Sequence, residues 1–122
     1  MPLTKKPVTG MKDITPAEMQ IREYVMNQIR ETYKSFGFSQ IETPCVEHIE
    51  NLTSKQGGDN EKLIFKVLKR GDKLNLETAQ DENDLTDSGL RYDLTLPLSR
   101  YYANNASSLP SPFKALQMGS VW

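Results

Sequence analysis

Four side chains that could bind ions or make strong hydrogen bonds fall within five positions, Arg91 to Thr95. They supply a guanidinium, a phenol, a carboxylate and a hydroxyl. If the segment is extended, Arg91 and Asp93 lie on one face of it, because side chains alternate with a period of two. A cation and an anion on one surface could form a polar pocket, but spacing alone favours a local ion pair worth about 0–1 kcal/mol.

The residues that follow predict how this segment is held. Thr95 has the side chain of a helix N-cap, and Pro97 suits an early helical turn, where its missing N–H does no harm. Leu98, Tyr101 and Tyr102 then recur at helical spacing. We therefore predict a short helix from Pro97 to Asn104, preceded by a strand-to-helix junction.

Composition limits what the whole chain can do. The chain has 122 residues, 15 basic and 16 acidic side chains and a net charge of −1, so no overall field attracts it to nucleic acid or membrane. The single cysteine, Cys45, excludes an internal disulfide framework and is expected to be a small buried residue in a reducing compartment. No apolar run reaches the roughly 18–20 residues of a membrane span. We expect one cytoplasmic domain without membrane contact.

The first predicted element is a long helix beginning at Pro16. Thr15, Pro16 and Glu18 form a capping-box pattern, and Gly37 is a typical C-terminal stop. An apolar stripe at spacings of three and four residues predicts packing on a sheet; its members are Val25, Met26, Ile29, Tyr33 and Phe36. The segment from Phe38 to Val46 reads as a strand, with Pro44 at its end, at a bulge or at an edge beside another chain.

The middle of the chain, residues 57–88, is predicted to have a structural role. Gly57, Gly58 and Asp59 lack the Gly-Lys-Ser/Thr sequence of a phosphate loop. Residues 63–68 and 74–76 flank a glycine turn and predict a β-hairpin. Residues 80–88 carry four acidic side chains without the spacing of a calcium loop, which favours a solvated loop with no metal site.

Three ordered motifs resemble a known family. Gly37, Phe38, Ile41 and Pro44 look like motif 1 of the class II aminoacyl-tRNA synthetases. Residues 10–14 with Pro16 resemble the opening of the histidyl-tRNA synthetase family, and residues 89–95 are similar to its histidine-contacting segment. The resemblance implies an α+β fold, a partial class II synthetase catalytic fold with an antiparallel sheet and a long motif 1 helix. It also implies a homodimer formed through motif 1.

The resemblance further implies the chemistry of the parent enzyme. That enzyme activates L-histidine with ATP and Mg²⁺ to histidyl-adenylate and transfers it to tRNA(His), by positioning and cationic stabilisation. Asp93 would hold the histidine ammonium group, with Leu94 and Thr95 beside it and Arg91 as a further candidate, either an orienter of Asp93 or a structural donor.

The same resemblance predicts where the chain stands within the catalytic domain. Residues 1–122 would run from motif 1 through the first strand of motif 2, at residues 113–122, with no anticodon-binding domain. The motif 2 arginine would follow Trp122, so we expect no catalytic residue, no aminoacylation and no tightly bound ATP or Mg²⁺ in this fragment.

Two other functions stay open at this stage. One is the synthetase-like regulatory subunit of ATP phosphoribosyltransferase in histidine biosynthesis, which would share the fold and much of residues 91–95. The other is a dimerisation module without catalysis. His48, the only histidine, has no partners that define a nucleophilic triad and is expected to be structural or exposed.

Overall fold

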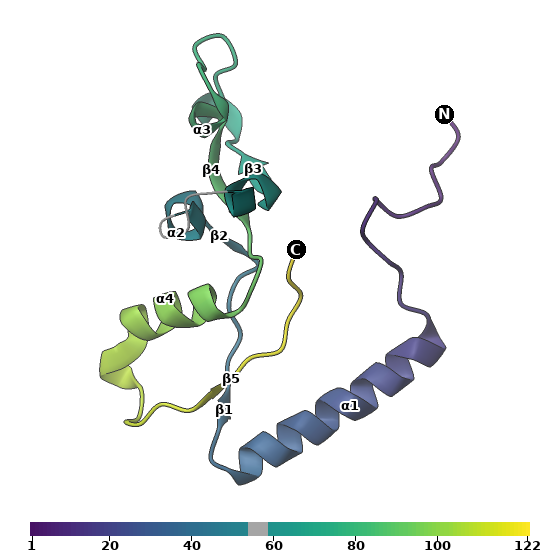
Figure 1. Ribbon diagram of the computed structural model, residues 1–122, viewed down its shortest axis with the longest axis vertical. Helices are drawn as coiled ribbons and strands as arrows, with labels where there is room; N and C mark the ends of the chain where they lie inside the picture. Colours follow the sequence, from purple (N-terminus) through teal and green to yellow (C-terminus); the bar gives the residue numbers. More distant parts are fainter. Residues whose placement is uncertain (54–58) are drawn as a thin grey trace. The chain divides into compact units, whose positions relative to one another are not determined.

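The computed structural model describes residues 1–53 and 59–122. The chain divides into two compact units, Met1–Ser39 and Gln40–Trp122, which are described separately below. Figure 1 traces both units along the sequence. Gly57 and Gly58, which lack a complete phosphate-loop sequence, lie outside the described residues.

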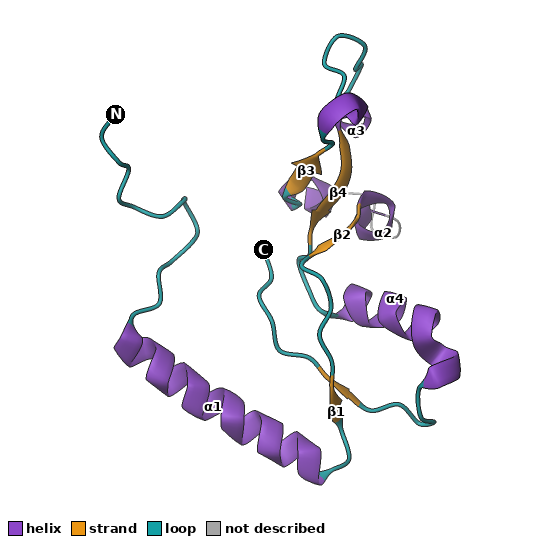
Figure 2. Cartoon of the chain, turned by 180° about the vertical axis from the view of Figure 1, so that it is seen from behind, coloured by secondary structure: helices purple, strands orange, loops and turns teal. Residues whose placement is uncertain are grey.

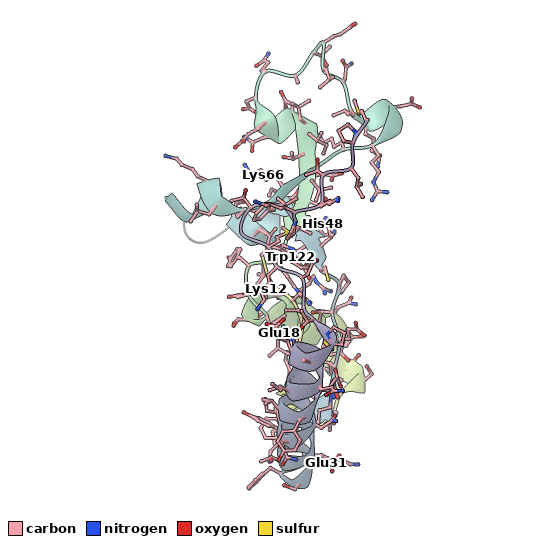
Figure 3. The ribbon with its side chains drawn as sticks, turned by 90° about the vertical axis from the view of Figure 1, so that its right-hand side faces the viewer. Lys12, Glu18, Glu31, His48, Lys66 and Trp122 are labelled. Carbon is pink, nitrogen blue, oxygen red and sulfur yellow. The ribbon has the colours of Figure 1, made fainter. Side chains whose placement is uncertain are left out.

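The first unit contains the long helix α1 (Pro16–Ser35). Its N-terminus has the predicted capping box: Thr15 Oγ1 accepts a hydrogen bond from the Glu18 N–H at 3.3 Å, and Glu18 Oε2 accepts one from the Thr15 N–H at 3.0 Å. Lys12 adds an ion pair with Glu18 at 2.5 Å (Figure 3). The Lys12 hydrogen bond, followed by those from Thr15, lowers the pKa of Glu18 from 4.5 to about 2.

The C-terminus of α1 closes on Gly37, as the sequence predicts. Gly37 has a φ of +81°, and its N–H donates to the Lys34 carbonyl at 3.0 Å. The Phe38 N–H donates to the Tyr33 carbonyl at 3.1 Å, and the rings of these two residues meet edge to face at 4.9 Å. This is a Schellman motif with its apolar contact. The motif needs a residue in the left-handed conformation just after the helix, and Gly37 supplies it.

The apolar stripe of α1 is not covered in this unit. No residue of α1 is buried, and Val25 is 48% exposed. The predicted packing of the stripe on a sheet is therefore not found within residues 1–39.

The second unit is organised around a three-stranded antiparallel sheet, with the order β2–β4–β3. Its strands are β2 (Val46–His48), β3 (Lys66–Leu68) and β4 (Thr86–Leu90), and Figure 2 shows β4 between the other two. Glu47 and Lys66 both pair with Gly89, from opposite sides. The short helix α2 (Ile49–Thr53) supplies the buried Leu52.

The predicted hairpin between residues 63–68 and 74–76 is wrong. β3 pairs with β4, and the predicted turn is a 3₁₀ helix, η2 (Gly71–Lys73), with no strand over residues 74–76. The reason lies in Asn75, whose Oδ1 accepts hydrogen bonds from the N–H groups of Glu77 at 3.1 Å and Thr78 at 3.3 Å. This local turn replaces the strand hydrogen bonds that a hairpin needs.

The acidic segment 80–88 is also more ordered than a solvated loop. It contains α3 (Glu82–Leu85), and β4 begins directly after it at Thr86. Asp81 caps α3, because its Oδ1 accepts from the N–H groups of Asn83 at 2.8 Å and Asp84 at 3.3 Å. Capping by an acidic residue explains part of the acidic composition.

The two strands predicted over residues 38–46 and 113–122 are shorter than expected. The segment 38–46 gives only β1 (Ser39–Gln40) and the first residue of β2, separated by irregular chain that includes Pro44, which has no N–H to donate. Residues 113–122 give only β5 (Ala115–Leu116), which pairs with β1. The Ile41 N–H donates to the Leu116 carbonyl at 2.9 Å, beside that pairing.

The predicted helix after the junction is α4 (Thr95–Asn105), followed by the 3₁₀ turn η3 (Ala106–Ser108). Pro97, the third residue of α4, has a fully buried side chain. Tyr101 and Tyr102 each stack on Phe113, with ring centroids 6.2 Å apart. One further 3₁₀ helix, η1 (Asp59–Leu63), precedes β3.

Candidate functional site

Arg91 does not share a surface with Asp93, contrary to the alternation predicted for an extended segment. β4 ends at Leu90, so the side-chain alternation of a strand does not extend to Arg91 and Asp93. Arg91 is only 5% exposed, and its Nε donates to the Ser120 carbonyl at 2.8 Å. Its Nη1 donates to the Thr43 carbonyl at 2.9 Å and to Thr43 Oγ1 at 3.0 Å. Arg91 is a structural donor that joins three segments.

The backbone of Arg91 is held as firmly as its side chain. Its N–H donates to the Cys45 carbonyl at 3.0 Å, and its carbonyl accepts from the Trp122 N–H at 2.9 Å. Gly119 lies so close that a Cβ at this position would overlap the Arg91 guanidinium. A glycine is therefore needed where the chain passes the buried arginine.

Asp93, and not Thr95, caps helix α4. Asp93 Oδ1 accepts hydrogen bonds from the N–H groups of Thr95 and Leu96, both at 3.2 Å. Thr95 is the first residue of the helix, which leaves its side chain outside the cap position. The predicted Thr95 cap is thus wrong, because the helix begins two residues before Pro97. The capping role uses one carboxylate oxygen of Asp93 and leaves Oδ2 without a hydrogen bond among the described residues.

Leu94 lies between two predicted histidine-binding residues, Asp93 and Thr95. Its carbonyl accepts from the Leu98 N–H at 3.2 Å and from Gln117 Nε2 at 2.9 Å. Gln117 Oε1 in turn accepts from Thr43 Oγ1 at 2.8 Å. Neither Thr43 nor Gln117 is identified by the sequence analysis, because the two residues are 74 positions apart and carry no motif.

A cavity of about 270 Å³ adjoins this hydrogen-bonded cluster. Its lining includes Thr43, Arg91, Leu94, Gln117 and the exposed Cys45. The expectation that Cys45 is buried is wrong, since the irregular chain around Pro44 turns it outward. His48, which is labelled in Figure 3, is exposed, in agreement with its predicted structural or surface position.

A partly buried ion pair between Arg100 and Glu47 ties α4 to the sheet. The side chain of Glu47, in β2, is 2% exposed, and Arg100 Nε donates to its two carboxylate oxygens at 2.9 and 2.7 Å. Sequence reasoning missed this pair because its members are 53 positions apart. It fixes the direction in which α4 leaves the 91–95 segment.

The four predicted motif 1 residues fall in different units. Gly37 and Phe38 form the Schellman end of α1 in the first unit, whereas Ile41 and Pro44 belong to the second. Ile41 is beside the β1–β5 pairing, and Pro44 is exposed. Among residues 1–53 and 59–122, no three His, Cys, Asp or Glu side chains are grouped so as to hold a metal ion.

Comparison with known proteins decides the family. A family model described as histidyl-tRNA synthetase matches residues 10–122. The chain belongs to the histidyl-tRNA synthetase family. Family membership confirms the resemblance drawn from the motifs.

Individual relatives of the family agree with this assignment. The chain is 43% identical over 116 residues to a probable histidine–tRNA ligase of Tropheryma whipplei, covering 95% of this chain and 27% of the relative. It is 44% identical over 120 residues to the histidine–tRNA ligase of Leifsonia xyli, covering 95% and 28%. The chain thus spans about a quarter of the length of the curated relatives it matches.

Solved structures support the α+β class II synthetase fold. The histidyl-tRNA synthetase of Nostoc superposes with a TM-score of 0.73 and 28% identity, over 98% of this chain and 25% of that one. A Bacillus halodurans protein described as an ATP phosphoribosyltransferase regulatory subunit/histidyl-tRNA synthetase gives a TM-score of 0.76 at 22% identity, over 100% and 28%. The second likeness concerns the fold alone. No helix among the described residues is long and apolar enough to cross a membrane.

Proposed function

We propose that the whole protein is a histidine–tRNA ligase. It activates L-histidine with ATP to histidyl-adenylate and then transfers the histidyl group to tRNA(His). The observation that carries this proposal is the identity of 43–44% to curated histidine–tRNA ligases across 95% of the chain. Its place of action would be the cytoplasm.

Within this activity, we assign Asp93, Leu94 and Thr95 to histidine binding. One oxygen of Asp93 caps α4, while the other is available for the ammonium group of the amino acid. A carboxylate suits this role, because hydrogen bonds between charged groups are short and strong. The cap also fixes the carboxylate before histidine arrives, which limits the entropy lost on binding. Arg91 contributes as a structural donor.

Asp93→Asn tests this assignment with little disturbance of the fold. Asparagine keeps the Oδ1 acceptor and is a good helix cap, but it removes the negative charge. A hydrogen bond to a charged group contributes about 1.5–3 kcal/mol, so the KM for histidine should rise about 10- to 150-fold. The KM for ATP should change less than about threefold, since no charge at the phosphates is lost.

The measurement is histidine-dependent ATP–pyrophosphate exchange by the full-length gene product. Asp72→Asn, on the exposed 3₁₀ helix η2, is the matched control and should leave both KM values unchanged. Equal effects of Asp93→Asn on the two substrates would remove Asp93 from the ammonium site. A gene product that binds histidine without charging tRNA would favour the regulatory alternative.

ATP and Mg²⁺ enter this proposal as a substrate and its ion. Mg²⁺ would be held mainly by the ATP phosphates and by water, so we propose no Mg²⁺ ligand among residues 1–53 and 59–122. Tight binding of ATP to residues 1–122 is not expected. Isothermal titration calorimetry of the 122-residue chain with MgATP tests this, and a submicromolar Kd would contradict it.

We also propose that the protein forms a homodimer through the motif 1 segment. The apolar stripe of α1 supports this, because Val25 and Tyr33 are 48% and 41% exposed within their unit. A second copy would bury the same face twice, as twofold interfaces do. Val25→Lys should then weaken self-association in sedimentation experiments at high micromolar concentration, whereas Gln28→Lys, at a polar exposed position of the same helix, should not. A monomer at that concentration would refute the proposal.

A further inference from the structure

We propose that Thr43 and Gln117 are positioning residues, which hold the backbone between Asp93 and Thr95 in the conformation that receives histidine. The inference rests on the proposed role of Asp93 and Thr95 in histidine binding. It concerns a hydrogen-bond relay that begins at the buried Arg91 and ends at the Asp93 carboxylate.

The first half of the relay runs through the Thr43 hydroxyl. Thr43 is 4% exposed, and its Oγ1 accepts from Arg91 Nη1 at 3.0 Å while donating to Gln117 Oε1 at 2.8 Å. A hydroxyl that accepts from a cation becomes a better donor, because hydrogen bonds in a chain polarise one another. The Arg91 charge thus strengthens the contact that orients the Gln117 amide.

The second half passes through a single peptide group. Gln117 Nε2 donates to the Leu94 carbonyl at 2.9 Å, and the N–H of the same peptide group, on Thr95, donates to Asp93 Oδ1 at 3.2 Å. Peptide groups are planar, so fixing the carbonyl direction also fixes the N–H direction. Gln117 therefore controls where the Asp93 carboxylate is held.

The expected consequence is selective for the amino acid. Losing the relay frees the Leu94–Thr95 peptide group to rotate. Among the described residues, the Leu94 carbonyl would then keep one hydrogen-bond donor, the Leu98 N–H. Misplacement of a binding group by about 1 Å can cost up to about 100-fold. We expect a rise of about tenfold in the KM for histidine and less than about twofold for ATP.

Thr43→Val and Thr43→Ser form the matched pair for the test, in the full-length gene product by pyrophosphate exchange. Valine removes the hydroxyl but leaves the Thr43 carbonyl bound to Arg91 Nη1, so the variant should fold. Serine restores the hydroxyl and should return the KM for histidine to within about twofold of the original. Gln117→Leu should reproduce the valine variant, and the double variant should add little, because both changes break one relay. Gln117→Glu keeps an acceptor for Thr43 Oγ1 and replaces the leucine variant if that one unfolds.

A purely structural role would lower stability in these variants without separating histidine from ATP. Unchanged KM values for histidine in Thr43→Val and in the Gln117 variant overturn the inference, provided that Asp93→Asn raises the histidine KM in the same assay. If Asp93→Asn has no selective effect either, the proposed histidine site fails, and the relay fails with it.

Discussion

Replacing Arg100 with methionine should strongly destabilise the second unit. Methionine fills similar space but cannot pair with Glu47, whose side chain is 2% exposed. The carboxylate would then lose both hydrogen bonds, at 2.9 and 2.7 Å, while water remains excluded from most of its surface. An uncompensated buried charge is among the most costly defects in a folded protein.

The magnitude follows from the burial of the two partners. Removing one member of a fully buried pair costs about 3–5 kcal/mol. Arg100 keeps 31% of its side chain exposed, so water can reach the vacated side of the pair. We therefore expect about 3 kcal/mol, at the lower end of that range. With a urea m-value of about 1–3 kcal/mol per molar, the unfolding midpoint should fall by about 1–3 M.

Urea unfolding followed by the fluorescence of Trp122, the single tryptophan, measures this change in the unit that contains the pair. Glu82→Gln is the control, because Glu82 pairs with Lys66 but keeps 72% of its side chain exposed. That variant should lose at most about 1 kcal/mol. Replacing both Glu47 and Arg100 with leucine should recover most of the loss, since apolar replacement of both partners is often neutral.

A cost of Arg100→Met no greater than that of Glu82→Gln would show that the buried Glu47 carboxylate does not depend on Arg100. If the double leucine variant is as unstable as the single variant, the loss comes from packing of the Arg100 stem and not from the unpaired carboxylate.

The remaining predictions concern two glycines and one carboxylate. Gly119→Ala should cost about 1–3 kcal/mol in urea unfolding, because the added methyl group displaces the buried Arg91 guanidinium; a stability equal to that of the original chain would contradict the close approach. Gly37→Ala should cost about 1–2 kcal/mol through its φ of +81°, measured as lost helicity of α1, and unchanged helicity would count against the Schellman end. The pKa of Glu18, lowered to about 2, means that its stabilising contribution is complete above pH 4.5 and is lost as the pH falls through 2. NMR titration should give that midpoint, and Lys12→Met should move it upward; a midpoint near 4.5 in the original chain would refute the ion pair.

The sequence by itself determined the elements whose causes are local. Helix α1 begins at the Thr15 capping box and ends at Gly37 because hydrogen bonds within a few residues satisfy its free backbone groups. The motifs also sufficed for the family, since they could be recognised without coordinates. In the same way, the position of α4 followed from Pro97 and the helical spacing after it.

Only the tertiary structure decided what depends on partners far along the chain. The sequence placed Arg91 beside Asp93, but the carbonyls of Thr43 and Ser120 turn it inward, at separations of 48 and 29 positions. β3 pairs with β4 because the Asn75 turn removes the nearer partner that a hairpin would use. Burial of a charged group is favourable only where distant carbonyl and hydroxyl oxygens converge on it, and no local pattern encodes that convergence.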